Sequence, residues 1–262
     1  MSPLDTQTRK ILSSWDIGST TKLAPNFIIT GHGRMMAPRN EHGKLIAAAA
    51  KAALAPLGLV RKGQSRVWRS DQRYWVIGVE FRPSGWSKGS YLNVSAGWLW
   101  HKKEFISQDA RFPVDDVGDA GFLPFESIEQ FRPRIKHMAE RAAEEVLAIR
   151  ERFRTFSGIH AHLMAHSERE DIWPIFHAAV TSGLVGDIER SRLLFERVHA
   201  RAQITNVSKH VTDSYAELAC SLHDSLRFRS IIAGNIQYTR RLNRLPDDPD
   251  CLDDALDFQG EQ

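Results

Sequence analysis

The fold is decided by residues 74–100, which read YWVIGVEFRPSGWSKGSYLNVSAGWLW. Apolar side chains occupy every second position in two parts of this stretch, namely Trp75, Ile77, Val79 and Phe81, and then Leu92, Val94, Ala96, Trp98 and Trp100. A period of two predicts strands that bury one face, over Tyr74–Phe81 and Ser90–Trp100. The connection between them is too short for a parallel crossover, so we expect the two strands to be antiparallel.

The flanking sequence extends this pair on both sides. Gln64–Ser70 predicts a further strand, joined to Tyr74–Phe81 by a hairpin turn, which makes an antiparallel meander. A helix is predicted over Glu41–Leu57, with Gly58 where a C-terminal cap belongs. Apolar residues at three- and four-residue spacing predict a long helix over Pro133–Phe156, whose apolar stripe is expected to cover the exposed face of the meander.

The remainder of the chain has helical patterns. They predict helices over 171–181, 187–201, 211–228 and 231–245. The expected fold class is therefore α+β: a helix and a three-stranded antiparallel meander covered by a long helix, followed by a helical C-terminal part. The predicted organisation is a poorly defined N-terminal segment (1–40), an α+β domain (41–156), a helical part (168–246) and an acidic tail (247–262).

Composition places the chain among globular proteins. Of its 262 residues, 42% are hydrophobic and 26% are charged, which argues against a disordered or fibrous chain. The longest apolar run, Leu45–Leu59, is broken by Lys51 and Pro56, so we expect no membrane-spanning segment. The first residues lack the features of a secretory signal, and two cysteines make no disulfide framework. The expected location is a reducing cytoplasm.

Charge is unevenly distributed along the sequence. Seven acidic residues and no Lys or Arg lie between Asp247 and Gln262. Without them, 25 acidic residues face 35 basic ones, so residues 1–246 carry a formal charge of about +10. We expect this acidic tail either to be a solvated chain end or to fold back near Arg240, Arg241 and Arg244, where it would weaken the binding of anionic partners.

Basic residues around a tryptophan form the clearest candidate binding site. They stand at the entry to the predicted sheet and comprise Arg61, Lys62, Arg66, Trp68 and Arg69. Cations interleaved with aromatic rings can follow a phosphate backbone while the rings stack on bases, although solvated surface charge explains many arginines equally well. The candidate set also includes two residues further along the chain, namely Trp86 in the predicted turn and Asn93 on the polar face of the strand that follows.

No catalytic or cofactor motif is present, so the question of an enzyme stays open and no cofactor is expected. The residues that could hold a metal are His160, His162 and His166, of which the last two are one helical turn apart. Leu163 stands where zinc hydrolases carry a glutamate, so metal binding is the weaker interpretation.

The stretch Leu54–Gly63, followed by Val67, Trp68 and Arg69, resembles an uncharacterised bacterial domain family. In that family a helix ends in Leu-Gly-Phe, a basic pair and Gly, and an antiparallel meander follows. Residues 76–84 and 91–94 match it in kind, whereas Leu59 replaces the usual Phe. Some members are suspected to occur near toxin–immunity or defence genes, so the resemblance implies a non-catalytic binding role.

Three functional hypotheses result. The first is a bacterial binding protein of immunity or defence type that acts through a protein partner. The second is a nucleic-acid-binding protein whose affinity falls steeply with salt. The third is a metal-dependent hydrolase that uses the histidine cluster.

Overall fold

The computed structural model describes residues 41–118, 121–169, 171–205 and 209–253. Its first element, helix α1 (Glu41–Leu54), continues into the short 3₁₀ helix η1 (Ala55–Leu57). Gly58 ends this helical segment with a φ of 76°, and its N–H donates to the carbonyl oxygen of Ala55 at 2.9 Å. A side chain would make this left-handed conformation costly, so the structure confirms the predicted glycine cap.

The sheet is antiparallel and has six strands within the described residues. They are β1 (Val60–Arg61), β2 (Val67–Asp71), β3 (Trp75–Arg82), β4 (Gly89–Trp98), β5 (Ala110–Phe112) and β6 (Phe122–Pro124). Strands β1 to β5 follow one another in order, and β6 pairs with β4 near the end of β4 opposite to its β5 contact. The predicted meander is β2–β3–β4, and the three added strands have only two or three residues each.

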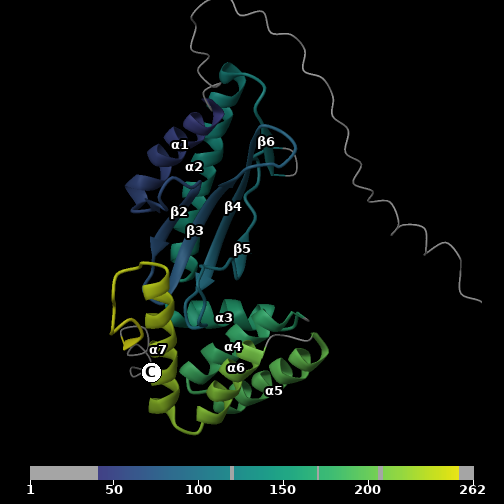
Figure 1. Ribbon diagram of the computed structural model, residues 1–262, viewed down its shortest axis with the longest axis vertical. Helices are drawn as coiled ribbons and strands as arrows, with labels where there is room; N and C mark the ends of the chain where they lie inside the picture. Colours follow the sequence, from purple (N-terminus) through teal and green to yellow (C-terminus); the bar gives the residue numbers. More distant parts are fainter. Residues whose placement is uncertain (1–40, 119–120, 170, 206–208, 254–262) are drawn as a thin grey trace, which may run out of the picture. The chain divides into compact units, whose positions relative to one another are not determined.

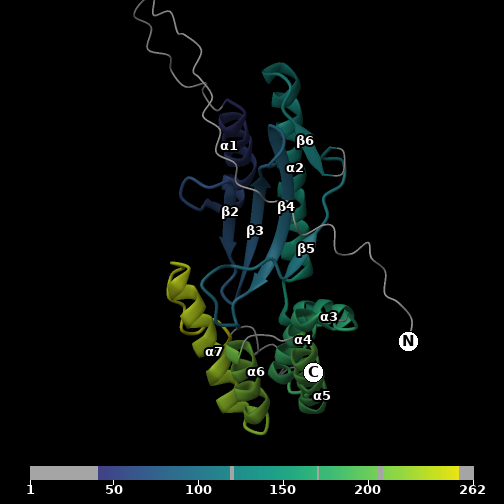
Figure 2. The same cartoon turned by 45° about the vertical axis from the view of Figure 1, so that its right-hand side comes forward.

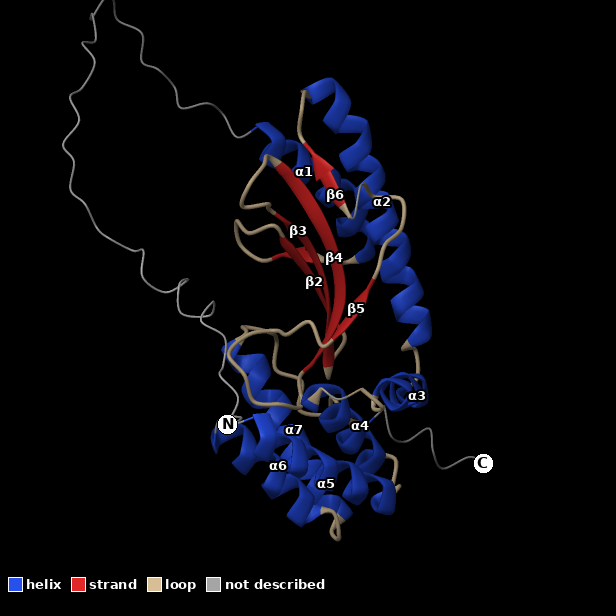
Figure 3. Ribbon diagram, turned by 90° about the vertical axis from the view of Figure 1, so that its right-hand side faces the viewer, coloured by secondary structure: helices blue, strands red, loops and turns tan. Residues whose placement is uncertain are grey.

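The two-residue period correctly identifies the buried face of the sheet. Across β3 and β4, Trp75 lies opposite Trp98 and Val79 lies opposite Val94, so the apolar residues of both strands share one face. Helices α1 and α2 (Ile128–Arg152) cover that face, as Figure 3 shows, and Phe153 at the end of α2 packs edge-on against Trp75. The α+β class and the covering long helix are therefore confirmed.

The start of α2 differs from the prediction. The helix begins at Ile128, and the Ser127 hydroxyl accepts a hydrogen bond from the backbone N–H of Gln130. Pro133 therefore lies inside the helix instead of opening it. The serine satisfies an N–H group that a helix start leaves without a partner, and this local signal outweighs the one intrahelical hydrogen bond that Pro133 removes.

The helical part comprises α3 (Phe156–His166), α4 (Ile172–Leu184), α5 (Ile188–Thr205), α6 (Lys209–Ser221) and α7 (Ser225–Leu242). Helices α3 to α6 gather at one end of the sheet in both Figure 1 and Figure 2. The single helix predicted over 211–228 is wrong, because the chain turns after α6 and Asp224 caps the start of α7. The Asp224 carboxylate accepts from the backbone N–H of Arg227 at 3.0 Å, which satisfies the new helix start.

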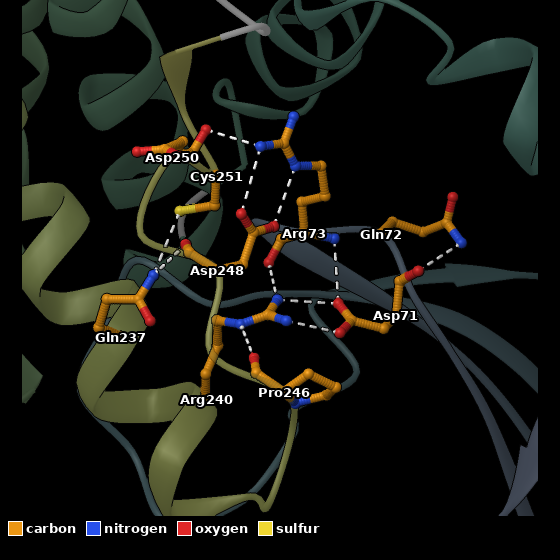
Figure 4. Close-up of polar contacts among 9 residues, drawn as sticks. All are labelled: Asp71, Gln72, Arg73, Gln237, Arg240, Pro246, Asp248, Asp250 and Cys251. Atoms are coloured by element: carbon orange, nitrogen blue, oxygen red, sulfur yellow. Dashed lines mark hydrogen bonds and ion pairs between the residues drawn. The ribbon is translucent and has the colours of Figure 1, made fainter.

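Helix α7 is fastened to the turn between β2 and β3 by paired charges, shown in Figure 4. The Arg240 guanidinium is only 2% exposed and donates to both carboxylate oxygens of Asp71, at 2.9 and 2.7 Å. It also donates to the carbonyl oxygen of Pro246 at 2.8 Å. A buried guanidinium needs such partners, because a charge left alone in the interior is strongly destabilising.

The segment after α7 adds a second pair to the same place. The Arg73 guanidinium donates to the two carboxylate oxygens of Asp248 at 3.0 and 3.2 Å, and to the Asp250 carbonyl oxygen at 2.7 Å. Cys251 and Leu252 are buried nearby. We call the two pairs, Arg240–Asp71 and Arg73–Asp248, the clasp. Residues 246–253 thus fold back onto the protein, although the carboxylate of Asp248 pairs with Arg73 rather than with the predicted arginines, and residues 254–262 lie outside the described residues.

The described residues from 41 to 253 belong to one compact unit. None of the described helices combines the length and the apolar character needed to cross a membrane.

Candidate functional site

The structure divides the predicted basic residues between the two faces of the sheet edge. Arg61 lies opposite Trp68 in the β1–β2 pair, and both line a cavity of about 300 Å³ together with Arg66. Arg69 projects from the opposite face of β2, because side chains alternate along a strand. Trp68 is buried in the core, so its ring is not available to stack on a base. The predicted cations therefore lie at the sheet edge, but the predicted aromatic ring is not accessible to a base.

We call Arg61, Lys62, Arg66, Arg69 and Arg244 the cationic edge. None of these five side chains has a carboxylate partner among the described residues. The charge of Arg69, followed by burial and the charge of Arg244, lowers the pKa of Lys62. Arg61 instead donates from Nε to the carbonyl oxygen of Ser65 at 2.6 Å, which holds its side chain against its own loop. A lysine whose pKa is lowered by its neighbours marks a surface where positive charge is not compensated.

Trp86 and Asn93 occupy different surroundings. Trp86 is 99% exposed in the turn between β3 and β4. Arg66 donates to the carbonyl oxygen of Gly89 at 3.5 Å, which places a cation beside that turn. Asn93 projects from the face of β4 away from α2, where its amide donates to the Glu80 carboxylate at 3.4 Å. Trp86 is therefore free to contact a partner, whereas Asn93 already has one.

A second polar cluster, absent from the predicted set, centres on Asp109 at the end of the β4–β5 connection. One oxygen of its carboxylate, Oδ2, accepts from the backbone N–H of Trp98 at 2.8 Å and from the Ser107 hydroxyl at 2.6 Å. It also accepts from the Lys103 ammonium at 3.2 Å. Burial works to raise the pKa of Asp109, but the His177 imidazole, the Lys103 ammonium and the Ser107 hydroxyl hold that pKa well below its ordinary value.

His177 of α4 completes this cluster in a defined tautomer. Its Nδ1 accepts a hydrogen bond from the Trp100 indole N–H at 3.0 Å, and an indole nitrogen can only donate. The ring proton is therefore on Nε2, which faces Asp109 Oδ1 at 3.5 Å. Burial lowers the pKa of His177 more than the Asp109 carboxylate raises it, which agrees with a neutral ring. Because Nδ1 is occupied and Nε2 carries the proton, His177 has no free base nitrogen.

Gly97 allows the β4–β5 connection, which includes Lys103 and Asp109, to lie close to β4. A Cβ atom at Gly97 would collide with the carbonyl oxygen of Ser107 and press on the side chain of Ile106. The glycine therefore allows residues 101–109 to cross β4 closely enough to bring Lys103 and Asp109 against α4.

A cavity of about 410 Å³ opens on the α3 side of Asp109. We call it the histidine cavity; its lining includes Arg111, His162, His166, Arg169 and Trp173. The two imidazole rings lie 4.3 Å apart between centroids, and His166 Nδ1 donates to the carbonyl oxygen of His162 at 2.7 Å. This bond orients the His166 ring and leaves its Nε2 for another partner.

Positively charged groups lie near the His162 ring of the histidine cavity. Burial, together with the charges of His166, Arg152 and Arg169, lowers the pKa of His162 to about 4. Within the described part of the chain, no carboxylate pairs with the guanidinium of Arg111 or Arg169. The two carboxylates that line the cavity are already engaged, Asp109 in its cluster and Asp171 as the N-terminal cap of α4. The cavity therefore offers donors and positive charge to an anion.

The third histidine of the predicted metal set faces elsewhere. His160 Nδ1 lies 3.1 Å from the Thr181 hydroxyl oxygen on α4. Among the described residues, no group of three or more His, Cys, Asp or Glu side chains is arranged to hold a metal ion. The geometry therefore gives the metal hypothesis no support.

One sequence signal could have directed attention to the Asp109 cluster. His177 interrupts a helix that is otherwise nearly all apolar, and a buried imidazole requires a hydrogen-bonding partner. Its hydrogen-bonding partner, Trp100, is 77 positions away along the chain, and no local pattern identifies it.

No protein-family model matches the chain, and no curated protein or solved structure matches it. The resemblance of its strand region to a bacterial domain family consequently stays a prediction.

Proposed function

We propose that this protein is a binding protein for a small anionic ligand, a carboxylate or a phosphate ester, that occupies the histidine cavity. The observation that carries the proposal is the pair of guanidiniums, Arg111 and Arg169, that line one cavity without a carboxylate partner among the described residues. Arginine presents donors in a planar fork that matches carboxylate and phosphate oxygens.

Three further features support this assignment. A cavity of about 410 Å³ is in the size range of small-molecule sites. The Asp109 cluster holds one wall of the cavity in place, since each of its polar side chains is fixed by a partner. The neutral imidazole of His162 adds a hydrogen-bond donor without adding negative charge, and His166 Nε2 becomes a donor when that ring is protonated.

The proposal is tested by titrating the full chain with inorganic phosphate and with citrate at constant ionic strength. We expect saturable changes in the NMR signals of the His162 ring and the Trp173 indole, together with a rise in the pKa of His162, because a bound anion offsets the neighbouring cations. Arg169→Ala should weaken binding at least tenfold, as expected when a charged hydrogen-bonding partner is removed.

Arg229→Ala is the matched control, because Arg229 is an exposed arginine on α7 that does not line the histidine cavity. The assignment fails if neither anion shifts these signals at millimolar concentration, or if both arginine variants bind equally.

A second binding role is favoured by the exposed Trp86 beside the cationic edge. We propose that this surface contacts an acidic protein partner. An exposed tryptophan flanked by cations is typical of an interface anchor. A protein partner is favoured over nucleic acid because Trp68, the ring expected to stack on bases, is buried.

Polyglutamate and a single-stranded oligonucleotide of equal charge distinguish these partners. We expect polyglutamate to bind with an affinity that falls with salt and that decreases in Arg66→Glu. Tighter binding of the oligonucleotide, with loss of that binding in Trp86→Ala, would favour nucleic acid instead.

A further inference from the structure

A second cavity, of about 560 Å³, lies on the other side of the Asp109 cluster and is lined by aromatic rings from three separate segments. Phe105 comes from the β4–β5 connection, Trp173 from the start of α4 and Tyr238 from α7. Phe105 is 62% exposed and Tyr238 is 42% exposed. We call this the aromatic cavity. Large apolar rings that face solvent around one hollow are favourable contacts for a flat ligand.

The base of the aromatic cavity is polar and rigid. The Lys103 side chain is only 8% exposed, and its ammonium is held by the Ser107 hydroxyl and by Asp109 Oδ2. An ammonium has three N–H donors, and no third acceptor for this one is found among the described residues. Asp109 balances the charge of Lys103, so the remaining donor can serve either a neutral carbonyl or a carboxylate.

One wall of the aromatic cavity is the Trp173 ring, which neighbouring side chains hold in place. The His101 and Trp173 rings lie 4.7 Å apart between centroids, and Trp173 also stacks at 6.3 Å on His177. His177 is fixed by Trp100 and faces Asp109, so the Trp173 ring rests on a side chain that cannot turn freely. A ring held in this way loses little conformational freedom when a ligand binds.

We infer that the aromatic cavity binds a small flat aromatic ring carrying a hydrogen-bond acceptor, with the ring packed among Trp173, Phe105 and Tyr238 and the acceptor at the Lys103 ammonium. This site is separate from the histidine cavity, although Asp109 and Trp173 line both. The inference therefore goes beyond the proposed anion-binding function and does not depend on it.

The experiment is an NMR titration of the full chain with benzoate, benzamide and cyclohexanecarboxylate. Benzoate and benzamide should both shift the Trp173 indole signal. Cyclohexanecarboxylate has the same carboxylate on a puckered ring, so we expect it to bind at least fivefold more weakly than benzoate.

Two substitutions on α7 provide a matched pair. Tyr238→Ala should weaken benzoate or benzamide binding about tenfold, because it removes one ring of the cavity. Leu242→Ala should not, because Leu242 is equally exposed, at 43%, but does not line the cavity. Phe105→Ala, in an exposed loop position, repeats the test without altering a helix. The inference is overturned if neither aromatic probe shifts Trp173, if the puckered ring binds as well as benzoate, or if the two α7 variants bind alike.

Discussion

The clasp and the histidine cavity both gather arginines, but they treat the charges differently. In the clasp, Arg240 and Arg73 each make two hydrogen bonds to a carboxylate. In the histidine cavity, Arg111 and Arg169 have no carboxylate partner among the described residues. A guanidinium paired inside the protein contributes to holding the structure together, whereas an unpaired one beside a cavity remains available for a ligand. Carboxylate pairing thus identifies Arg240 and Arg73 as structural in a chain that has 25 arginines.

The largest effect is expected where the pairing is most buried. Arg240→Ala should lower the free energy of unfolding by about 3–5 kcal/mol, because Asp71 and the Pro246 carbonyl group lose their donor. Arg241→Ala, at the exposed neighbouring position, should change it by less than about 0.5 kcal/mol. Urea unfolding measures both, and equal losses would show that the clasp does not stabilise the fold.

The second-largest loss of stability is expected for a substitution in the Asp109 cluster. Asp109→Asn removes the charge beside Lys103 while keeping the shape of the side chain, and we expect a loss of about 2–4 kcal/mol. Adding Lys103→Met should recover part of that loss, because the uncompensated ammonium is then absent. A double-mutant cycle in urea checks the coupling, and strictly additive losses would mean that the pair is not coupled in the folded protein.

A pH effect should distinguish the histidine cavity from the clasp. The pKa of His162 is lowered to about 4, whereas an unfolded histidine titrates near 6.5. Between these values the unfolded chain binds a proton that the folded protein does not, so stability falls as the pH decreases from about 6.5 toward 4.

After allowance for its partial exposure, His162 should contribute about 1 kcal/mol to this decrease. The free energy of unfolding should depend less steeply on pH in His162→Gln than in the wild-type protein. The pKa of His177 is also lowered, and His177 contributes equally to the pH dependence of both proteins. Phosphate should also reduce the pH dependence of the free energy of unfolding of the wild-type protein. Identical slopes for the two proteins would contradict the depressed pKa of His162.

The smallest effect concerns the more exposed half of the clasp. Asp248→Asn should cost only about 0.5–1 kcal/mol, because the Arg73–Asp248 pair is partly solvated. A more sensitive readout is the Cys251 thiol, which is buried and has a pKa raised to about 11 by burial and by Asp248. In a Cys220→Ser background, Asp248→Asn should accelerate the labelling of Cys251 several-fold, since local opening limits the reaction. An unchanged labelling rate would show that Asp248 does not close the segment.

The sequence predicts the long elements of this fold well and the short ones poorly. The period of two from Trp75 to Phe81 correctly identifies the core face, because burial on one side of a strand dictates that pattern. Strands β1, β5 and β6 are too short to show any period. The helix break before Asp224 is missed because the apolar spacing continues past it while a cap begins a new helix.

The candidate sites show the same limit. Sequence reasoning finds four of the five members of the cationic edge, since Arg61, Lys62, Arg66 and Arg69 are close in sequence. It does not find the pairing of Asp109 with His177, because tertiary packing alone brings the β4–β5 connection against α4. It also assigns Trp68 to a binding surface, where the sheet uses that ring as core.

The clasp also shares its loop-closure entropy with other contacts of α7. Asp71 and Arg240 are 169 positions apart, and joining them as a first contact would cost on the order of 4 kcal/mol in loop-closure entropy. Helix α7 is independently attached to the residues after β4, through Asn235 to the Trp100 carbonyl oxygen and Thr239 to the His101 carbonyl oxygen. Once those bonds form, Arg240 is already near the β2–β3 turn and little entropy remains to be lost. The bonds from α7 to the backbone after β4 therefore account for most of the loop-closure cost, and the ion pairs close an arrangement that those bonds already favour.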